Sequence, residues 1–165
     1  MFSVGIITAS DKGSKGERED VSGMVIKEMI ENEGYQVQEY KILPDDRETL
    51  SNAMINMADD NNVNLILTTG GTGFSMRDWT PEATKDIIHR EAPGIAEGMR
   101  YHSLQITPRA MLSRGVAGIR GETLIINLPG SPKAVKENLE FVLPSLKHGL
   151  EILIGKASEC GQQQK

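Results

Sequence analysis

The chain has 165 residues, the length of one domain that can bury an adequate core without disulfides or bound metals. With 38% hydrophobic and 25% charged residues, 17 glycines and 7 prolines, its composition excludes a disordered or collagen-like chain. The single cysteine, Cys160, excludes an internal disulfide framework and a cysteine-rich zinc site.

The formal net charge is −5, which disfavours a non-specific binder of nucleic acid or of anionic membranes. Residues 1–62 hold 6 Lys and Arg against 13 Asp and Glu, a net charge of −7, whereas residues 63–165 hold 12 against 10, a net charge of +2. An anionic ligand therefore prefers the second part, and the acidic first part suits a divalent cation.

Membrane insertion and secretion are both disfavoured. No apolar run reaches the ~18 residues of a membrane span. Residues 1–10 lack the basic start of a signal peptide and are followed at once by Asp11. We therefore expect a cytoplasmic protein that binds neither membranes nor nucleic acid.

The N-terminal part alternates between strand and helix patterns. Its first strand is short, apolar and rich in Val and Ile, and apolar residues then recur at helical spacing. The predicted elements are, in order, a buried strand at 2–10, a loop at 13–16, a helix at 21–33, a strand at 35–43 and a helix that carries Leu50, Ala53, Met54 and Met57.

The rest of the chain continues this alternation. The run Leu65-Ile66-Leu67 suits a central strand, and Pro144 can kink the last helix. The predicted elements are a strand at 63–69, a glycine-rich loop, helices at 81–91 and 95–105, a bent strand pair at 111–121, a strand at 123–128 and a helix carrying the apolar positions between 135 and 150.

Strands that alternate with helices predict an α/β fold with a largely parallel sheet covered on both faces. We expect a single domain at 1–158 and a frayed tail at 159–165. In such sheets, ligands bind at the carboxyl ends of the strands.

The strongest functional pattern is Thr68-Thr69-Gly70-Gly71-Thr72-Gly73, which lies between a strand and a helix. Glycines let the backbone turn its N–H groups inward, which is the geometry of a phosphate cradle. The loop is neither a Walker A motif nor GxGxxG. The alternative is a plain tight turn.

Two aspartates follow strands at the same expected edge. Asp78 lies beside the glycine loop, before a helix that Thr80 and Pro81 already suit as its N-cap and first residue. It is therefore a candidate Mg²⁺ ligand, or else a surface residue paired with Arg77. Asp45 is a second candidate, although Asp45 with Glu48 also resembles a capping box.

Further candidates lie at other strand ends. Ser10 and Asp11 end the first strand, and Asp20 and Ser22, which precede a helix, are binding residues or simple caps. The turn Pro129-Gly130-Ser131-Pro132 is either a helix cap or a second binding loop. The nearby side chains able to bind a polar ligand or phosphate are Ser113, Asn127, Arg109, Arg114, Arg120 and Lys133.

These motifs resemble the MogA/MoaB family of molybdenum-cofactor biosynthesis and the related G domains of plant proteins and of gephyrin. The resemblance spans residues 3 to about 155. It is carried by Ser10-Asp11, Asp20-x-Ser22-Gly23, Pro44-Asp45, Thr69-Gly70-Gly71-Thr72-Gly73-Phe74, Arg77-Asp78-x-Thr80-Pro81-Glu82-Ala83-Thr84, Pro93-Gly94, Ala110-Met111-Leu112-Ser113-Arg114, Gly118-Ile119-Arg120-Gly121 and Leu124-Ile125-Ile126-Asn127-Leu128-Pro129-Gly130-x-Pro132.

The resemblance implies a three-layer α/β/α domain that forms a homotrimer and transfers AMP from MgATP to molybdopterin, releasing pyrophosphate. It assigns catalysis and Mg²⁺ to Asp45 and Asp78. Nucleotide and phosphate binding fall to Ser10, Asp11, Gly70, Gly71, Thr72 and Gly73, and pterin binding to Ser113, Asn127, Pro129, Gly130, Ser131 and Pro132. A downstream molybdate-insertion protein is an expected partner.

One residue departs from the family pattern, and two other functions stay open. Trp79 stands where a smaller residue is usual, and it either crowds the site or packs against the loop. The first alternative function is a non-catalytic molybdopterin-binding or scaffold protein, like the inactive MoaB-type members. The second is a nucleotide hydrolase of the competence-damage type, which shares the glycine-rich loop followed by Asp-x-Thr.

Overall fold

A six-stranded sheet forms the centre of the structure, which is a computed structural model that describes residues 1–156. The strand order is β2-β1-β3-β6-β5-β4. The first four of these run parallel, and β5 is antiparallel to β6 and to β4. In chain order the strands are β1 (Ser3–Ala9), β2 (Gln36–Leu43), β3 (Leu65–Thr69), β4 (Arg90–Glu91), β5 (Ala117–Arg120) and β6 (Thr123–Leu128).

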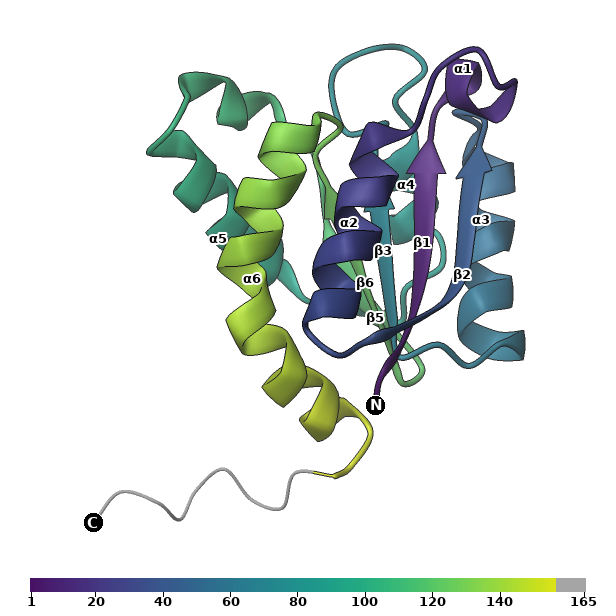
Figure 1. Cartoon of the computed structure of the whole chain (residues 1–165), viewed down its shortest axis with the longest axis vertical. Helices are drawn as coiled ribbons and strands as arrows, with labels where there is room; N and C mark the ends of the chain where they lie inside the picture. The colour runs from purple at the N-terminus through teal and green to yellow at the C-terminus, as the bar shows by residue number, and fades with distance from the viewer. Residues whose placement is uncertain (157–165) are drawn as a thin grey trace.

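Helices cover both faces of this sheet (Figure 1). They are α1 (Asp11–Ser14), α2 (Val21–Asn32), α3 (Arg47–Ile55), α4 (Thr80–Lys85), α5 (Pro93–Leu104) and α6 (Pro132–Leu153), with a π-helical turn η1 (Asn56–Asp60) and a 3₁₀ turn η2 (Pro108–Leu112). None of the helices within residues 1–156 is both long and apolar enough to span a membrane.

Two hydrophobic cores, one on each face, hold the layers together. Alternate residues of a strand point to opposite faces, so Ile6 joins the core under α2, α5 and α6, while Ile7 joins the core under α3 and α4. Every residue of β3 and β6 is buried, as expected for strands covered on both sides. The three-layer α/β/α prediction is confirmed.

Some local predictions differ from the structure, and tertiary pairing explains the largest difference. Residues 11–14 form a short helix that overlaps the loop predicted at 13–16, and the Ser10 hydroxyl caps this helix by accepting the Gly13 N–H at 2.9 Å. Helix α4 ends at Lys85 rather than near residue 91, because residues 89–91 bond to β5. The expected strand pair at 111–121 is half right, since η2 precedes β5.

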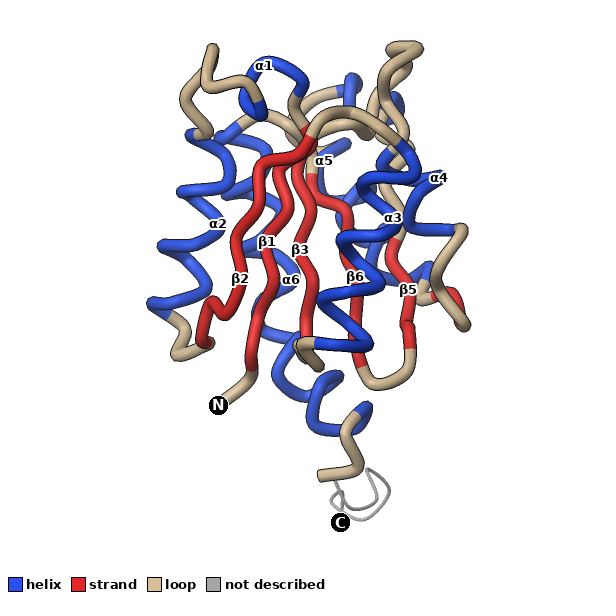
Figure 2. The backbone as a smooth tube through the Cα atoms, turned by 90° about the vertical axis from the view of Figure 1, so that its right-hand side faces the viewer, coloured by secondary structure: helices blue, strands red, loops and turns tan. Residues whose placement is uncertain are grey.

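The strand order places four loops at one edge. Strand β1 lies between β2 and β3, so the chain reverses direction across the sheet there, and ligands bind in α/β sheets at such a point. Figure 2 shows β2, β1, β3 and β6 side by side, with the loops that follow them at the upper end. The predicted site residues all come from these loops or from the segments beside them. The predicted frayed tail, 159–165, and the end of the predicted domain at 158 lie outside the described residues.

Candidate functional site

The glycine-rich loop after β3 has a backbone that only glycine adopts readily. Gly70 and Gly71 have φ angles of +86° and +66°. A Cβ at Gly70 would lie 2.4 Å from the Ala9 carbonyl oxygen, and one at Gly71 would lie 2.4 Å from the Thr80 hydroxyl oxygen. This close approach brings the loop against both β1 and α4.

Thr80 holds this loop and does not cap α4, which corrects the sequence-based prediction. Trp79 occupies the N-cap position without a side-chain cap bond, and Thr80 is the first helical residue. The Thr80 hydroxyl donates to the Gly70 carbonyl at 2.9 Å. Trp79 is 37% exposed, and the Arg47 guanidinium lies 5.8 Å from its ring centre.

A second loop, after β6, is fastened beside the first. The Thr69 hydroxyl donates to the Pro129 carbonyl at 2.7 Å, and the Ser22 hydroxyl donates to the Gly130 carbonyl at 2.7 Å. Asp20 caps α2 by accepting the Gly23 N–H at 2.9 Å. The two predicted binding loops therefore lie next to each other, and Ser22 secures one of them.

Asp11 and Asp45 bind each other's backbone across the ends of β1 and β2. The Asp11 N–H donates to Asp45 Oδ2 at 2.9 Å, and the Asp45 N–H donates to Asp11 Oδ1 at 3.0 Å. The predicted capping role of Asp45 is wrong, because Asp46 is the N-cap of α3 and accepts the Thr49 N–H at 2.8 Å. Asp45 is thus left at the carboxyl edge of the sheet, bonded to a main-chain N–H and available to a cation.

The two carboxylates differ in their electrostatic environment. Arg77 donates two hydrogen bonds to Asp11, at 3.0 and 2.9 Å, and this lowers the pKa of Asp11. Burial raises the pKa of Asp45, and the negative charges of Asp11 and Asp78 add to this effect. Asp45 is therefore a carboxylate whose charged form a bound cation would stabilise.

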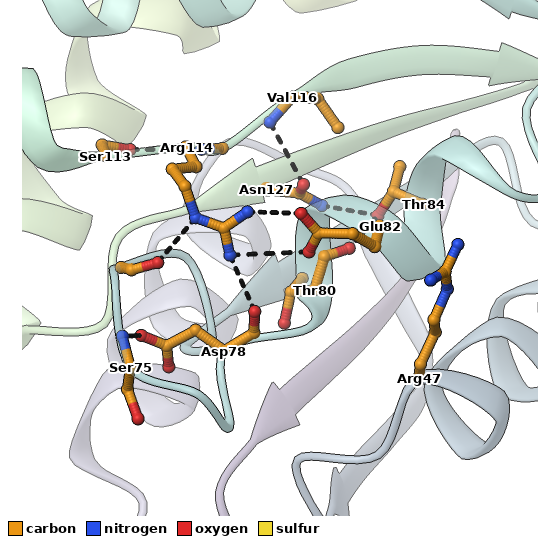
Figure 3. A network of polar contacts seen from close by, with 12 residues as sticks. Arg47, Ser75, Asp78, Thr80, Glu82, Thr84, Ser113, Arg114, Val116 and Asn127 are labelled. Carbon is orange, nitrogen blue, oxygen red and sulfur yellow. Dashed lines mark hydrogen bonds and ion pairs between the residues drawn. The ribbon is translucent and has the colours of Figure 1, made fainter.

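Asp78 lies under the same loop, as the close view of this region shows (Figure 3). Its Oδ2 accepts the Ser75 N–H at 2.9 Å and would lie 2.9 Å from a Cβ at Gly73. Arg77 pairs with Asp11 instead, so the alternative of a surface Asp78–Arg77 pair is wrong. Asp78 thus stands close to the glycine loop.

The carboxylates alone do not make a metal centre. Within residues 1–156, no group of three or more His, Cys, Asp or Glu side chains is arranged to hold a metal ion. Mg²⁺ is typically bound by one or two carboxylates together with substrate phosphates and water. Asp45 and Asp78 beside a phosphate-type loop fit that donor set, with a substrate supplying the remaining oxygens.

A cavity of about 450 Å³ opens next to these loops, between α5, η2 and the start of α6. Its walls include apolar groups such as Met99 and Ala96 and the basic side chains of Arg109 and Lys133. Of the predicted pterin-binding residues, the cavity is lined by Ser113, Asn127, Pro129 and Ser131. Gly130 and Pro132 lie outside its lining, and Ser131 also caps α6 by accepting the Ala134 N–H at 3.2 Å.

Asn127 shapes the wall of this cavity. It is 2% exposed, and its side-chain oxygen accepts the Val116 N–H at 3.1 Å. Its amide nitrogen donates to the hydroxyls of Thr68 and Thr84 at 3.0 and 2.9 Å. Asn127 therefore ties β6 to β3, to α4 and to the segment that follows Ser113.

The basic residues divide into two groups. Arg109 and Lys133 line the cavity, and the Lys133 ammonium lies 3.8 Å from a carboxylate oxygen of Glu137. Arg120 pairs with Asp59, and Arg114 pairs with Glu82, so neither stands free to meet a phosphate. The sequence motifs did not indicate Arg100, which donates to the Gly115 carbonyl at 2.6 Å. No local motif predicts that contact.

Comparison with known proteins assigns the family. The model of a family described as a probable molybdopterin binding domain, involved in molybdenum cofactor biosynthesis, matches residues 5–148. The molybdopterin adenylyltransferase of Helicobacter pylori strain J99 is 41% identical over 162 residues, 97% of this chain and 92% of that protein. Dictyostelium discoideum gephyrin is 45% identical over 163 residues, 93% of this chain but 23% of gephyrin.

A solved structure shows the same fold. The molybdopterin biosynthesis enzyme MoaB from Thermus thermophilus is 50% identical, with a TM-score of 0.90, and the match covers 96% of this chain and all of that one. The family match and these identities extend over nearly the whole chain, including both loops and the cavity. The chain therefore belongs to the molybdopterin-binding-domain family of molybdenum cofactor biosynthesis.

Proposed function

We propose that this protein is a molybdopterin adenylyltransferase, which transfers AMP from MgATP to the terminal phosphate of molybdopterin and releases pyrophosphate. The observation that carries the proposal is the meeting of two different half-sites at one edge of the sheet. A glycine loop with Asp45 and Asp78 suits a metal-bound triphosphate. The neighbouring cavity, partly apolar and lined by Ser113 and Asn127, suits a pterin.

In this reaction an oxygen of the molybdopterin phosphate attacks the α-phosphorus of ATP. A new P–O bond forms, the bond from the α-phosphorus to the bridging oxygen breaks, and that oxygen leaves with pyrophosphate. A phosphate monoester has a second pKa near ~6, so the attacking group is mostly a dianion at neutral pH. The step therefore needs no general base, in keeping with carboxylates rather than a histidine beside the loop.

The obstacle is repulsion between two polyanions. Unit charges ~4 Å apart interact by about 4 kcal/mol at an effective dielectric constant of ~20. Bound Mg²⁺ would offset part of this charge, held by Asp45 and Asp78. The N–H groups of residues 70–73 would bind phosphate oxygens, and Arg109 and Lys133 would face the pterin phosphate. Ser10 and Asp11 would fix the end of β1, where the Asp11 N–H donates to the Asp45 carboxylate.

Purified protein given MgATP and molybdopterin should form adenylyl-molybdopterin and pyrophosphate in equal amounts. Asp78→Asn and Asp45→Asn should each lower turnover by about 10²-fold or more, because transition-state charge is then less well offset. Asp59→Asn is the matched control, since Asp59 pairs with Arg120 away from the loops and should leave turnover unchanged.

A non-catalytic molybdopterin-binding or scaffold protein is the alternative, and the same assay separates the two. Tight pterin binding with no pyrophosphate from wild-type protein would establish a carrier. Pyrophosphate or AMP released without a pterin acceptor would instead indicate a nucleotide hydrolase. We further propose a cytoplasmic homotrimer that passes its product to a molybdate-insertion protein, which sedimentation and pull-down experiments with that partner would test.

A further inference from the structure

Arg114 makes an unusually complete set of contacts, all of them to the nucleotide side of the site (Figure 3). Its Nε donates to the Gly73 carbonyl at 2.7 Å, and its Nη2 donates to the Asp78 carbonyl at 2.7 Å. Its guanidinium also forms an ion pair with Glu82 in the first turn of α4. Its backbone N–H donates to the Thr72 carbonyl at 2.8 Å. One residue thus holds the end of the glycine loop, the main chain of Asp78 and α4.

The chain neighbours of the same residue lie on the pterin side. Arg114 lies between Ser113 and Gly115, both of which line the cavity. From the opposite side, Arg100 of α5 holds the Gly115 carbonyl, and the Val116 N–H is fixed by Asn127. Ser113 and Gly115 therefore line one substrate site, while the side chain of Arg114, which lies between them, binds the loop of the other site.

We propose that Arg114 is a positioning residue that couples the two substrate sites. Molybdopterin in the cavity fixes the segment around Ser113, and Arg114 transmits this order to Gly73 and Asp78, so that each substrate tightens the binding of the other. The coupling is reciprocal by thermodynamic necessity. This inference rests on the proposed function, because it takes MgATP and molybdopterin as the two ligands.

The geometry requires arginine rather than another cationic side chain such as lysine. Three acceptors surround the guanidinium: two carbonyls that belong to the loop and one carboxylate. A planar fork with five N–H donors reaches all of them at once, whereas a lysine ammonium is a point charge that can pair with Glu82 and leave the carbonyls unbound. Arg114→Lys therefore keeps the charge but removes the link to Gly73 and Asp78.

The test measures binding and needs no turnover. Calorimetry under anaerobic conditions gives the dissociation constant of the protein for the Mg²⁺ complex of α,β-methylene-ATP. It is measured with and without saturating molybdopterin. We expect wild-type protein to bind the nucleotide about 5- to 150-fold more tightly when molybdopterin is present, the usual range of coupling between sites. In Arg114→Lys this factor should fall to about 1, while each single ligand still binds.

Arg120→Lys is the matched control. Arg120 also pairs with a carboxylate and donates to a carbonyl, those of Asp59 and Ile87, but it lies away from both substrate sites. It should keep the wild-type coupling factor. Glu82→Gln retains the two carbonyl bonds of Arg114 and weakens only its anchor on α4, so it should give an intermediate factor even where Arg114→Lys folds poorly.

Three results would overturn the proposal: no coupling in wild-type protein, wild-type coupling in Arg114→Lys, or equal losses in Arg114→Lys and Arg120→Lys. If Arg114→Lys kept wild-type coupling but had a lower melting temperature, Arg114 would be a structural residue only. Coupling in wild-type protein without any adenylyl-molybdopterin would instead refute the proposed reaction and leave this inference intact.

Discussion

At the level of single residues, Asp45 is placed at a cost to stability. Burial and two neighbouring carboxylates raise its pKa, so the folded chain holds the Asp45 proton more tightly than the unfolded chain does. The unfolded state then binds fewer protons, and stability falls as pH rises from the ordinary pKa of 3.8 through the raised value. Above that window the full penalty is present in the protein without bound cation.

Asp45→Asn should therefore raise the melting temperature at pH 7 while lowering turnover. The gain should disappear below pH 3.8, where the carboxyl is protonated in both states. Thermal unfolding at several pH values measures it. The control, Asp59→Asn, should lose stability at pH 7, because Arg120 lowers the pKa of Asp59 and so stabilises its charged form. A lower melting temperature for Asp45→Asn at pH 7 would contradict the assignment.

Gly70 offers a second test, of backbone shape rather than charge. Gly70→Ala should destabilise the fold by more than the roughly 1–2 kcal/mol that a left-handed conformation costs an L-residue, because its Cβ would lie 2.4 Å from the Ala9 oxygen. Gly121→Ala isolates the conformational cost, since φ there is +56° and, among the described residues, no atom beyond its chain neighbours lies within 4 Å of its Cβ. Denaturant unfolding gives both values, and equal losses would mean that the contact with Ala9 relaxes freely.

The residues at this edge could be predicted from the sequence, but their partners could not. Glycines and aspartates directly after strands predicted the loops and the acidic positions. Asp45 and Asp46 are adjacent and both suit a helix cap, so no local pattern chooses between them. The choice is made by the Asp11 N–H, which holds Asp45, and that contact spans 34 positions in the sequence.

At the level of elements, α6 depends on its first turn. The Ser131 hydroxyl accepts the Ala134 N–H, and losing such a cap costs about 1 kcal/mol. Ser131→Ala should therefore lower the free energy of unfolding by about that amount, and Ser131→Asp, which caps equally well, should restore it. Urea titration measures both. An unchanged value in Ser131→Ala would mean that water or Pro132 satisfies this helix end.

Element types were predicted best where burial and periodicity agree, as in β3, β6 and α2. The prediction failed where tertiary pairing decides. Residues 86–91 continue a helical pattern after α4, yet His89 N–H donates to the Ile119 carbonyl at 2.8 Å and Arg90–Glu91 become an edge strand. A long-range partner thus overrides the local preference.

At the level of the whole molecule, function depends on strand order. Alternating strands and helices predicted a parallel sheet, but no local pattern shows that β6 lies beside β3 or that the loop at Pro129 meets the loop at Gly70. That adjacency puts the cavity next to the glycine loop. The same order places β2, which Asp45 follows, on the other side of β1 from β3 and its glycine loop. Asp45 and Asp78 are therefore both candidate ligands of the metal ion.

If the cation links the protein to the triphosphate, nucleotide binding should need Mg²⁺ and pterin binding should not. At 100 times its dissociation constant a ligand stabilises the folded state by about 2.7 kcal/mol, which raises the melting temperature of a domain this size by roughly 5–11 °C. EDTA should abolish the shift caused by ATP and leave the shift caused by molybdopterin. Unliganded protein with EDTA is the control and should not change. An ATP shift that survives EDTA would mean that the backbone of residues 70–73 and nearby basic groups bind the triphosphate without a metal, and Asp45 and Asp78 would then need another role.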